Sequence, residues 1–301
     1  MGLALGGGAA RGFAHIGIVK ALAARGLQPD VVAGTSMGAL VGGLYAAGRL
    51  DALEEWARSL TRRSVFGYMD FSLSGSGLIR GDRLGARLTE ALGDLEIEAL
   101  PLRFAAITTE IGTGHEIWLT RGKLSDSLRA SYALPGIFTP VASGHRWLVD
   151  GALVNPVPVS AARALGARLV IAVNVNADLF GRGTTIAEYG PDEPDTDWER
   201  RVRTRHGVDN PSGTERLVSR QVLGTGRRPG FATIMVEAFN IMQDRITRAR
   251  LAGDPADVTI NPPLGPIGLF DFHRAAEAIE IGEQAAERAL EPIEQALTTL
   301  T

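Results

Sequence analysis

Short apolar runs alternate with longer helical stretches over the first fifty residues of the chain. Residues 2–5 and 30–33 are apolar, have the length of strands and lead into turns that contain glycine. Residues 12–25 carry apolar side chains at helical spacing, residues 39–47 are mostly small and apolar, and both stretches stop before a glycine. This order of strand, helix, strand and helix predicts parallel strands with helices on the faces of the sheet.

The same patterns continue along the rest of the chain. Further strands are expected at residues 102–108, 115–119, 147–149, 169–175 and 257–260. Further helices are expected at residues 51–62, from a cap at Asp82 to residue 92, and at 124–132, 160–165, 231–250 and 272–297. We expect residues 1–301 to form one α/β domain, with three α/β/α layers around a mostly parallel central sheet.

One long segment departs from this pattern. Between residues 178 and 230 the hydrophobic periodicity fades, while proline, glycine, aspartate and arginine accumulate. Such a composition predicts a polar loop or lid, inserted in the domain and mobile, rather than a core element. The arginines of its second half fit either a solvated surface or a patch that binds lipid headgroups.

Composition and charge narrow the function classes. The net charge of −3 gives no sign of a nucleic-acid partner. The absence of cysteine excludes a disulfide framework, a thiolate zinc site and a cysteine nucleophile. No signal peptide is recognisable, and the longest apolar stretch, residues 37–47, is too short to span a bilayer. We expect a cytoplasmic protein without metal or cofactor, whose contact with membranes, if any, is peripheral.

The first candidate for chemistry is Ser36, in the run GTSMG at residues 34–38. A serine between Gly34 and Gly38, on a sharp turn from a strand into a helix, is exposed at the end of the sheet and at a helix N-terminus. The flanking glycines remove side chains that would clash in such a turn. The pattern therefore indicates a serine nucleophile, and its alternative is a serine that merely caps the helix.

A glycine run, GGGAARG, at residues 6–12 lies between the first strand and the first helix. Such a run turns several backbone N–H groups in one direction and binds an anion, which fits an oxyanion hole or a phosphate loop. The spacing fits neither a Walker A loop nor a dinucleotide fingerprint. Arg11 would either pair with an anionic substrate or brace the loop.

A serine nucleophile needs a base, and two kinds are available. The five histidines are His15, His115, His145, His206 and His273, and none follows a late strand as a hydrolase histidine would. Asp150 directly follows an apolar strand, and Gly151 after it permits close backbone approach. Asp150 is therefore the candidate base, and its alternative is an ordinary Asp-Gly turn.

Taken together and in this order, these motifs resemble those of the patatin-like phospholipase family, particularly its bacterial cytoplasmic members. Residues 3–12, 34–39, 130–138, 150–158 and 267–275 carry the resemblance. It implies a serine–aspartate dyad of Ser36 and Asp150, with an oxyanion hole formed by the amides of Gly7, Gly8 and Ala9. Ala9 stands where many members have a further glycine, which is tolerable unless its φ must be positive.

The predicted function is hydrolysis of carboxylic esters of lipids, phospholipid or lysophospholipid, through an acyl-enzyme. Two alternatives stay open from the sequence. One keeps the chemistry but uses soluble short-chain esters or thioesters. The other is a non-catalytic module that binds an anion and regulates another protein. The expected partner is thus a lipid or ester substrate.

Overall fold

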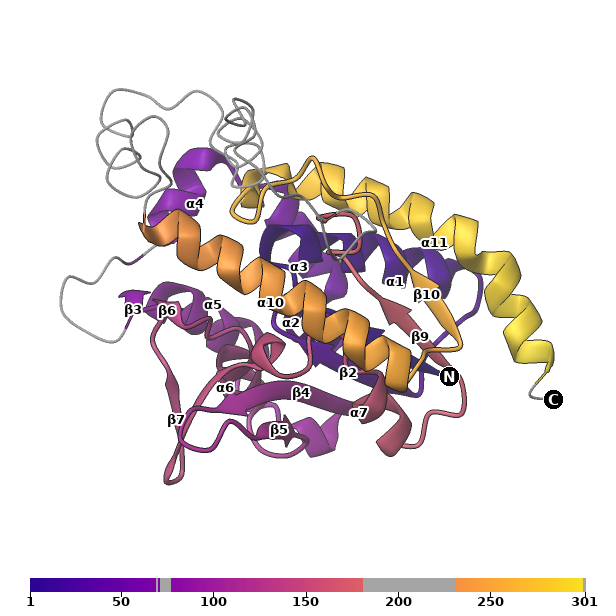
Figure 1. The fold of residues 1–301 in the computed structure, drawn as a ribbon, viewed down its shortest axis with the longest axis horizontal. Helices are drawn as coiled ribbons and strands as arrows, with labels where there is room; N and C mark the ends of the chain where they lie inside the picture. The colour runs from indigo at the N-terminus through magenta and orange to yellow at the C-terminus, as the bar shows by residue number, and fades with distance from the viewer. Residues whose placement is uncertain (69, 71–76, 181–230, 300–301) are drawn as a thin grey trace, which may run out of the picture.

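The computed structural model of the chain describes residues 1–301 except 69, 71–76, 181–230 and 300–301 (Figure 1). A mixed, mostly parallel sheet forms the middle layer, with strands in the order β10-β9-β1-β2-β4-β8-β7 and β5 paired to β4. The parallel strands are β1 (Gly2–Leu5), β2 (Val31–Thr35), β4 (Arg103–Glu110), β9 (Val170–Val173) and β10 (Val258–Ile260). The antiparallel ones are β5 (Glu116–Leu119), β7 (Val141–Ser143) and β8 (Arg146–Asp150). The predicted fold class is confirmed.

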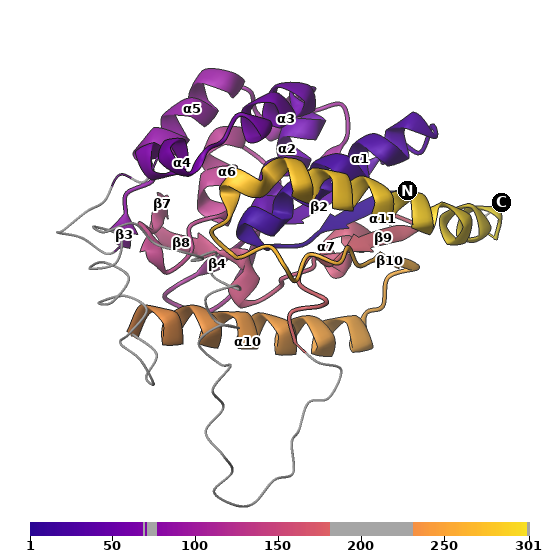
Figure 2. The ribbon, with the colours of Figure 1, turned by 90° about the horizontal axis from the view of Figure 1, so that it is seen from above.

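Helices cover both faces of this sheet. The helices are α1 (Ala14–Ala24), α2 (Met37–Ala46), α3 (Leu50–Arg58), α4 (Arg62–Tyr68), α5 (Asp82–Leu92), α6 (Leu124–Ser131), α7 (Val159–Ala164), α10 (Phe231–Gly253) and α11 (Ala275–Thr298). Short 3-10 turns are η1 (Ala9–Phe13), η2 (Ile97–Ala99), η3 (Gly151–Leu153) and η4 (Phe272–Arg274). Figure 2 shows α1, α2, α6 and α11 on one side of the sheet, and α7 and the long helix α10 on the other.

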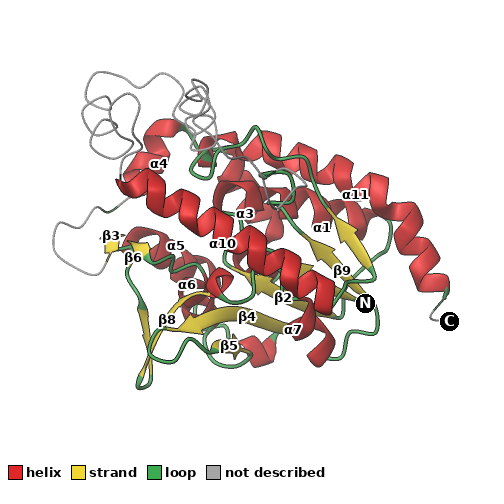
Figure 3. Cartoon of the chain, in the orientation of Figure 1, coloured by secondary structure: helices red, strands yellow, loops and turns green. Residues whose placement is uncertain are grey.

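Each face of the sheet has its own apolar core. Leu3, Leu5 and Val32 point to the side of α1, α2 and α11, while Ala4 and Val31 point to the side of α7. Because both faces are covered, β1, β2 and β9 are buried along their whole length, as their continuous apolar runs predict (Figure 3). The central strands therefore hold their carboxyl ends in fixed positions at one edge.

The structure corrects several details. The helix expected at 51–62 ends at Arg58. Helix α4, which was not expected, begins at Arg62, where Thr61 and Ser64 exchange side-chain and backbone hydrogen bonds that start the helix. Asp82 does not cap α5: it lies inside the helix, and the carboxylate of Asp70 accepts from the amides of Gly81 and Asp82. The strands β7, β3 (Gly77–Ile79) and β6 (Gly136–Phe138), the last two paired in a small separate sheet, were not expected.

The predicted loop or lid at 178–230 lies, from residue 181 onward, outside the described residues. None of the helices in the described ranges combines the length and apolar composition needed to cross a membrane.

Candidate active site

Ser36 occupies the turn between β2 and α2 in a strained conformation. Its φ of 56° is positive, which is uncommon for a residue other than glycine. Side chains at Gly34 and Gly38 would collide with the backbone of Ala39 and Leu5, so the turn requires both glycines. The Ser36 hydroxyl makes no capping bond to α2, and the alternative of a simple helix cap does not fit this geometry.

Instead, the Ser36 hydroxyl donates a hydrogen bond to Asp150. Ser36 Oγ lies 2.6 Å from Asp150 Oδ2, and the other carboxylate oxygen, Oδ1, accepts from the amide of Ala152 at 2.8 Å. Asp150 is buried, and this burial raises its pKa to about 6, against the opposing effect of both hydrogen bonds. A carboxylate with this pKa is ionised at neutral pH and is a better proton acceptor than an exposed one.

Strand register places this pair. Thr35 pairs with Ile107 across β2 and β4, and Thr108 pairs with Asp150 across β4 and β8. The residue after Thr35 is Ser36, so Ser36 and Asp150 lie level with each other on either side of β4. Because the side chains of a strand alternate between faces, a slip of one residue in β8 would turn Asp150 away.

A second hydroxyl fixes the backbone of the turn. Ser131, in the last turn of α6, accepts from the Ser36 amide at 2.9 Å and donates to the Ile107 carbonyl at 2.7 Å. Both bonds are buried. They connect the strained turn to the neighbouring strand β4 and hold Ser36 in place.

The glycine loop of residues 6–8 runs directly beside Ser36. A Cβ added at Gly7 would lie 3.3 Å from the Ser36 Cβ. The Gly7 amide donates to the Pro156 carbonyl at 3.0 Å, so of the three predicted oxyanion donors it is the one already engaged. The amides of Gly8 and Ala9 donate to no acceptor among the residues that the structure describes, and both residues line the same pocket as Ser36. Ala9 has a φ of 45°, the case in which a glycine would be the easier residue.

Side chains hold the carbonyls of this loop from behind. His15 Nε2 lies 2.7 Å from the Gly6 carbonyl oxygen, and burial lowers the pKa of His15 to about 4, so the ring is neutral and donates from Nε2. Asn176 Nδ2 donates to the Gly7 carbonyl at 2.9 Å. Arg11 is fully buried and donates to the Ile267 carbonyl and to Asn176, which places it as a brace of the loop.

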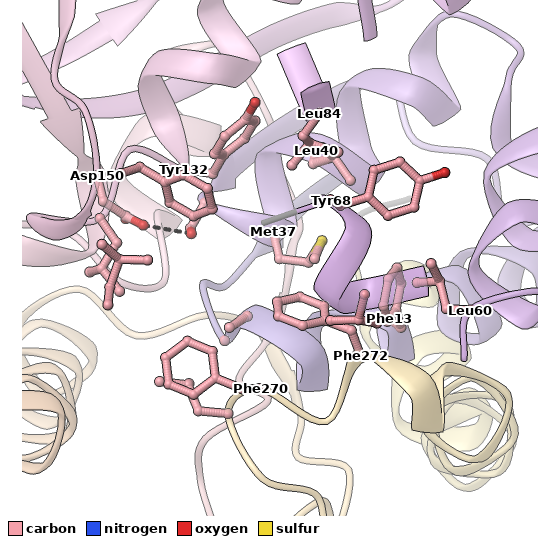
Figure 4. Close-up of a pocket in the computed structure, with 18 of the residues that line it drawn as sticks. Phe13, Met37, Leu40, Leu60, Tyr68, Leu84, Tyr132, Asp150, Phe270 and Phe272 are labelled. Carbon is pink, nitrogen blue, oxygen red and sulfur yellow. Dashed lines mark hydrogen bonds between the residues drawn. The ribbon is translucent and has the colours of Figure 1, made fainter. Parts of the chain in front are cut away.

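An apolar pocket of about 140 Å³ opens beside the Ser36–Asp150 pair (Figure 4). Apart from Ser36, Asp150, Gln243 and the small residues of the glycine loop, aliphatic and aromatic side chains line it, among them Phe13, Leu40, Leu60, Tyr68, Leu84, Tyr132, Phe270 and Phe272. Phe13 packs edge to face on both Trp56 and Phe272. Such a lining fits a hydrocarbon chain.

The site brings together most of the residues that the sequence singled out. Gly151 lies against the Ile107 carbonyl, where a side chain would clash, so it lets Asp150 approach β4. No histidine in the described part of the chain hydrogen-bonds to Ser36 or Asp150, and His206 lies outside that part. Sequence reasoning included Ser131 and Pro156 in segments that carry the family resemblance but gave them no role, and it missed Asn176. The position of Asn176 directly after the buried strand expected at residues 169–175 was the signal that could have indicated it.

Comparisons with known proteins agree with these motifs. The family model described as patatin-like phospholipase matches residues 3–163. An uncharacterized NTE family protein of Mycobacterium tuberculosis is 33% identical over 335 residues, covering 97% of this chain and 91% of that protein. A protein of Yarrowia lipolytica named as a lysophospholipase is 30% identical over 299 residues, covering 96% of this chain but 19% of its own length.

The crystal structure of VipD from Legionella pneumophila aligns with a TM-score of 0.44 and 14% identity, covering 96% of this chain and 66% of that chain. This likeness is too low to add to the family assignment, which rests on the family model and the mycobacterial relative. The chain belongs to the patatin-like phospholipase family.

Proposed function

We propose that this protein is a serine acyl hydrolase that cleaves carboxylic ester bonds of lipids, either phospholipids or lysophospholipids, through a dyad of Ser36 and Asp150. The observation that carries the proposal is the 2.6 Å hydrogen bond from the Ser36 hydroxyl to the buried Asp150 carboxylate, at the wall of an apolar pocket. The pair supplies a nucleophile and a base, and the pocket supplies room for an acyl chain.

In the first half of the reaction, Asp150 Oδ2 accepts the hydroxyl proton while Ser36 Oγ attacks the ester carbonyl carbon. The carbonyl oxygen becomes negative and accepts from the amides of Gly8 and Ala9, which are preorganised for it. The carbon–oxygen bond to the alcohol then breaks, and the proton on Asp150 passes to the leaving alkoxide. The acyl group stays on Ser36 as an ester.

In the second half, a water molecule replaces the alcohol. Asp150 accepts a proton from this water, whose oxygen attacks the acyl carbon of the Ser36 ester. The tetrahedral intermediate uses the same two amides, and its collapse releases the fatty acid and returns the proton from Asp150 to Ser36. One carboxylate thus serves as base and then as acid in each half.

Three observations support a lipid over a small soluble ester as substrate. The pocket is lined almost entirely by aliphatic and aromatic side chains. The chain belongs to a family named for phospholipases, and one relative is named as a lysophospholipase. Soluble short-chain esters remain the competing substrate class, and a comparison of chain lengths separates the two.

The test is a substrate panel with the wild-type protein and Ser36→Ala. It compares nitrophenyl esters of rising acyl length, a lysophospholipid and a diacyl phospholipid, and adds labelling by a fluorophosphonate probe. We expect kcat/KM to rise with acyl length, and Ser36→Ala to lose activity by a factor on the order of 10³ or more, together with labelling. Near-normal hydrolysis by Ser36→Ala would refute the proposal. An unlabelled wild-type protein would favour the anion-binding module instead.

A further inference from the structure

Helix α10 has large apolar side chains on its outer face, where a surface helix is expected to be polar, and several polar residues on its inner face. Ile234, Met235, Ile241 and Met242 face outward, with 50%, 54%, 47% and 48% of their surfaces exposed. Asn240, Gln243 and Thr247 on the opposite face are buried. Polar residues would cover the outer face at no cost to packing, so four large apolar side chains there need another explanation.

Helix α11 shows what the same protein does with a helix that has only a structural role. It has nearly the same length as α10, 24 residues against 23. Its buried residues include Ala278, Ile279, Ala286 and Ile293, and polar residues separate them. The pattern of α10 is therefore specific to that helix.

Helix α10 also borders the candidate active site. Phe239 and Gln243, on its inner side, line the pocket that contains Ser36 and Asp150. Both ribbon views place the first turns of α10 at the side of the molecule where α4, β3 and β6 lie (Figures 1 and 2). The exposed apolar face and the pocket are thus two sides of one helix.

Other exposed apolar side chains lie beyond the same edge of the sheet. Ile111 directly follows β4, three residues after Thr108, and Thr108 is level with Ser36. The backbone N–H of Ile111 donates to the Trp147 carbonyl. The side chains of Ile111 and Trp147 are more than half exposed. Exposed apolar side chains thus lie beyond the end of β4 as well as on α10.

We propose that the outer face of α10, formed by Ile234, Met235, Ile241 and Met242, docks on the surface of a lipid layer. This inference rests on the proposed function, because phospholipids are held in aggregates from which the enzyme must draw its substrate. A broad apolar face on the helix that borders the pocket fits the surface of such a lipid layer, which removes these side chains from water.

The test measures co-sedimentation with vesicles of phosphatidylcholine and phosphatidylglycerol, in the Ser36→Ala background so that no lipid is consumed. Ile241→Glu is compared with Ala24→Glu, which adds the same charge at an exposed position at the end of α1. We expect Ile241→Glu to weaken vesicle binding by at least about tenfold, since a carboxylate replaces an exposed apolar side chain that docking on the lipid layer would bury, and Ala24→Glu to leave it unchanged. Equal binding by the two variants, or no vesicle binding by the parent protein, would overturn the proposal.

Two further measurements separate the outcomes. A dimer of the parent protein that Ile241→Glu dissociates in size-exclusion chromatography would assign the face to a second copy and overturn the lipid assignment. With Ser36 restored, Ile241→Glu should hydrolyse a soluble ester at the wild-type rate but phospholipid vesicles more slowly. If the wild-type protein hydrolysed neither the soluble ester nor phospholipid, the proposed function would instead be refuted, and vesicle binding would still be measurable.

An independent observation concerns Asn176, which is hydrogen-bonded on all sides of its amide. Its Oδ1 accepts from Arg11 at 3.3 Å, and its Nδ2 donates to the Gly7 carbonyl at 2.9 Å and to Gln243 at 3.4 Å. Because a guanidinium only donates and a carbonyl only accepts, this orientation of the amide is fixed by its partners.

The bond to Gly7 has a geometric consequence. The Gly7 carbonyl and the Gly8 N–H belong to one planar trans peptide and point in opposite directions. By holding that carbonyl, Asn176 directs the Gly8 N–H to the other side, where Gly8, Ser36 and Asp150 line the pocket. We infer that Asn176 is a positioning residue for the oxyanion-binding peptide, again within the proposed function.

The test replaces Asn176 by aspartate, which keeps the shape and the contact with Arg11 but cannot donate to Gly7. We expect kcat to fall by about tenfold or more with little change in KM, and the affinity for a trifluoromethyl ketone, a tetrahedral mimic, to fall by the same factor. Asn174→Asp is the control, because within the described part of the chain Asn174 uses only its side-chain oxygen, which accepts from the backbone N–H of Asn176. Unchanged kcat and inhibitor affinity in Asn176→Asp, or the same loss in Asn174→Asp, would overturn this role without touching that of Ser36.

Discussion

The edge of the sheet at Ser36 and Asp150 and the contact between α1 and α11 are built in opposite ways. At the edge, Ala9 and Ser36 have positive φ angles, Asp150 is a buried carboxylate, and the amides of Gly8 and Ala9 donate to no acceptor among the described residues. Between α1 and α11, Gly17 and Gly282 let the two helix backbones touch, and small apolar residues fill the contact. The first region has a strained backbone and amides without a described acceptor, which is typical of functional sites, and the second region is closely packed. Substitutions should therefore change activity in the first region and stability in the second.

The largest expected effect is that of Asp150→Asn. The asparagine keeps the shape and the contacts with Ser36 and Ala152 but removes the base, so kcat should fall by a factor on the order of 10³. The free energy of unfolding of this variant should instead increase at neutral and alkaline pH. Folding raises the pKa of Asp150 from 3.8 to about 6, so the favourable contribution of its carboxyl group is present below pH 4 and is lost as the pH rises through about 6. At pH 8 the variant should be more stable by up to about 3 kcal/mol in urea unfolding. A less stable variant would contradict the contrast.

Gly282→Ala should have the next largest effect, on stability. A methyl group at Gly282 would collide with the backbone carbonyl of Ala14, so α11 must move away from α1. We expect a loss of about 2–3 kcal/mol in the free energy of unfolding, with kcat/KM per folded molecule unchanged. Gly67→Ala in α4 is the control, because no described residue lies within 4 Å of its Cβ position, and it should be neutral or slightly stabilising. Equal changes in the free energy of unfolding of the two variants would contradict this explanation by packing.

The pH dependence of the wild-type protein sharpens the contrast further. The base must be ionised, and burial raises the pKa of Asp150 to about 6. We expect kcat/KM for a soluble nitrophenyl ester to fall about tenfold per pH unit below this pKa and to be flat above it up to pH 8. A profile already flat at pH 5 would mean that Asp150 is not the base or that its burial does not raise its pKa.

The smallest expected effect comes from two neighbouring alanines. Ala9→Gly relieves the positive φ and should stabilise the protein by up to about 1 kcal/mol, because the strain outweighs the added freedom of the unfolded chain. Ala10→Gly, in ordinary backbone and buried, should destabilise it by about 1 kcal/mol. Thermal unfolding of the two variants checks the signs. The same sign for both would show that Ala9 is not strained.

The sequence predicted those parts of the fold that local patterns encode. The buried strands β1, β2 and β9 are continuous apolar runs, and the turns at Ser36 and Asp150 follow strands directly, so both were readable. The strands β3, β6 and β7 have three residues each, so little alternation can show in them, although β10, of the same length, was expected. The break before α4 depends on mutual hydrogen bonds of Thr61 and Ser64, a local signal that was overlooked.

The rest of the site could not be read locally, because its contacts join distant segments. Asn176 meets Gly7 across 169 positions, and Ser131 meets Ser36 across 95. No short pattern records that Pro156 occupies the amide of Gly7. The roles of Gly8 and Ala9 as oxyanion donors stay predictions. Because the Gly7 amide already donates to Pro156, these two amides are the remaining candidates of the three.

The register of β2, β4 and β8 sets Ser36 level with Asp150, and it does not depend on the sequence of the segments that connect these strands. Trp56, Leu60, Tyr68 and Leu84, which line the far wall of the pocket, all come from the crossover between β2 and β4. Insertions or exchanges in that crossover alter which acyl chain fits, while the hydrogen-bond ladder keeps the reacting groups in register. Selectivity and chemistry thus reside in separable pieces of sequence, and new substrate preferences can evolve, or be engineered, by replacing α3 to α5 alone.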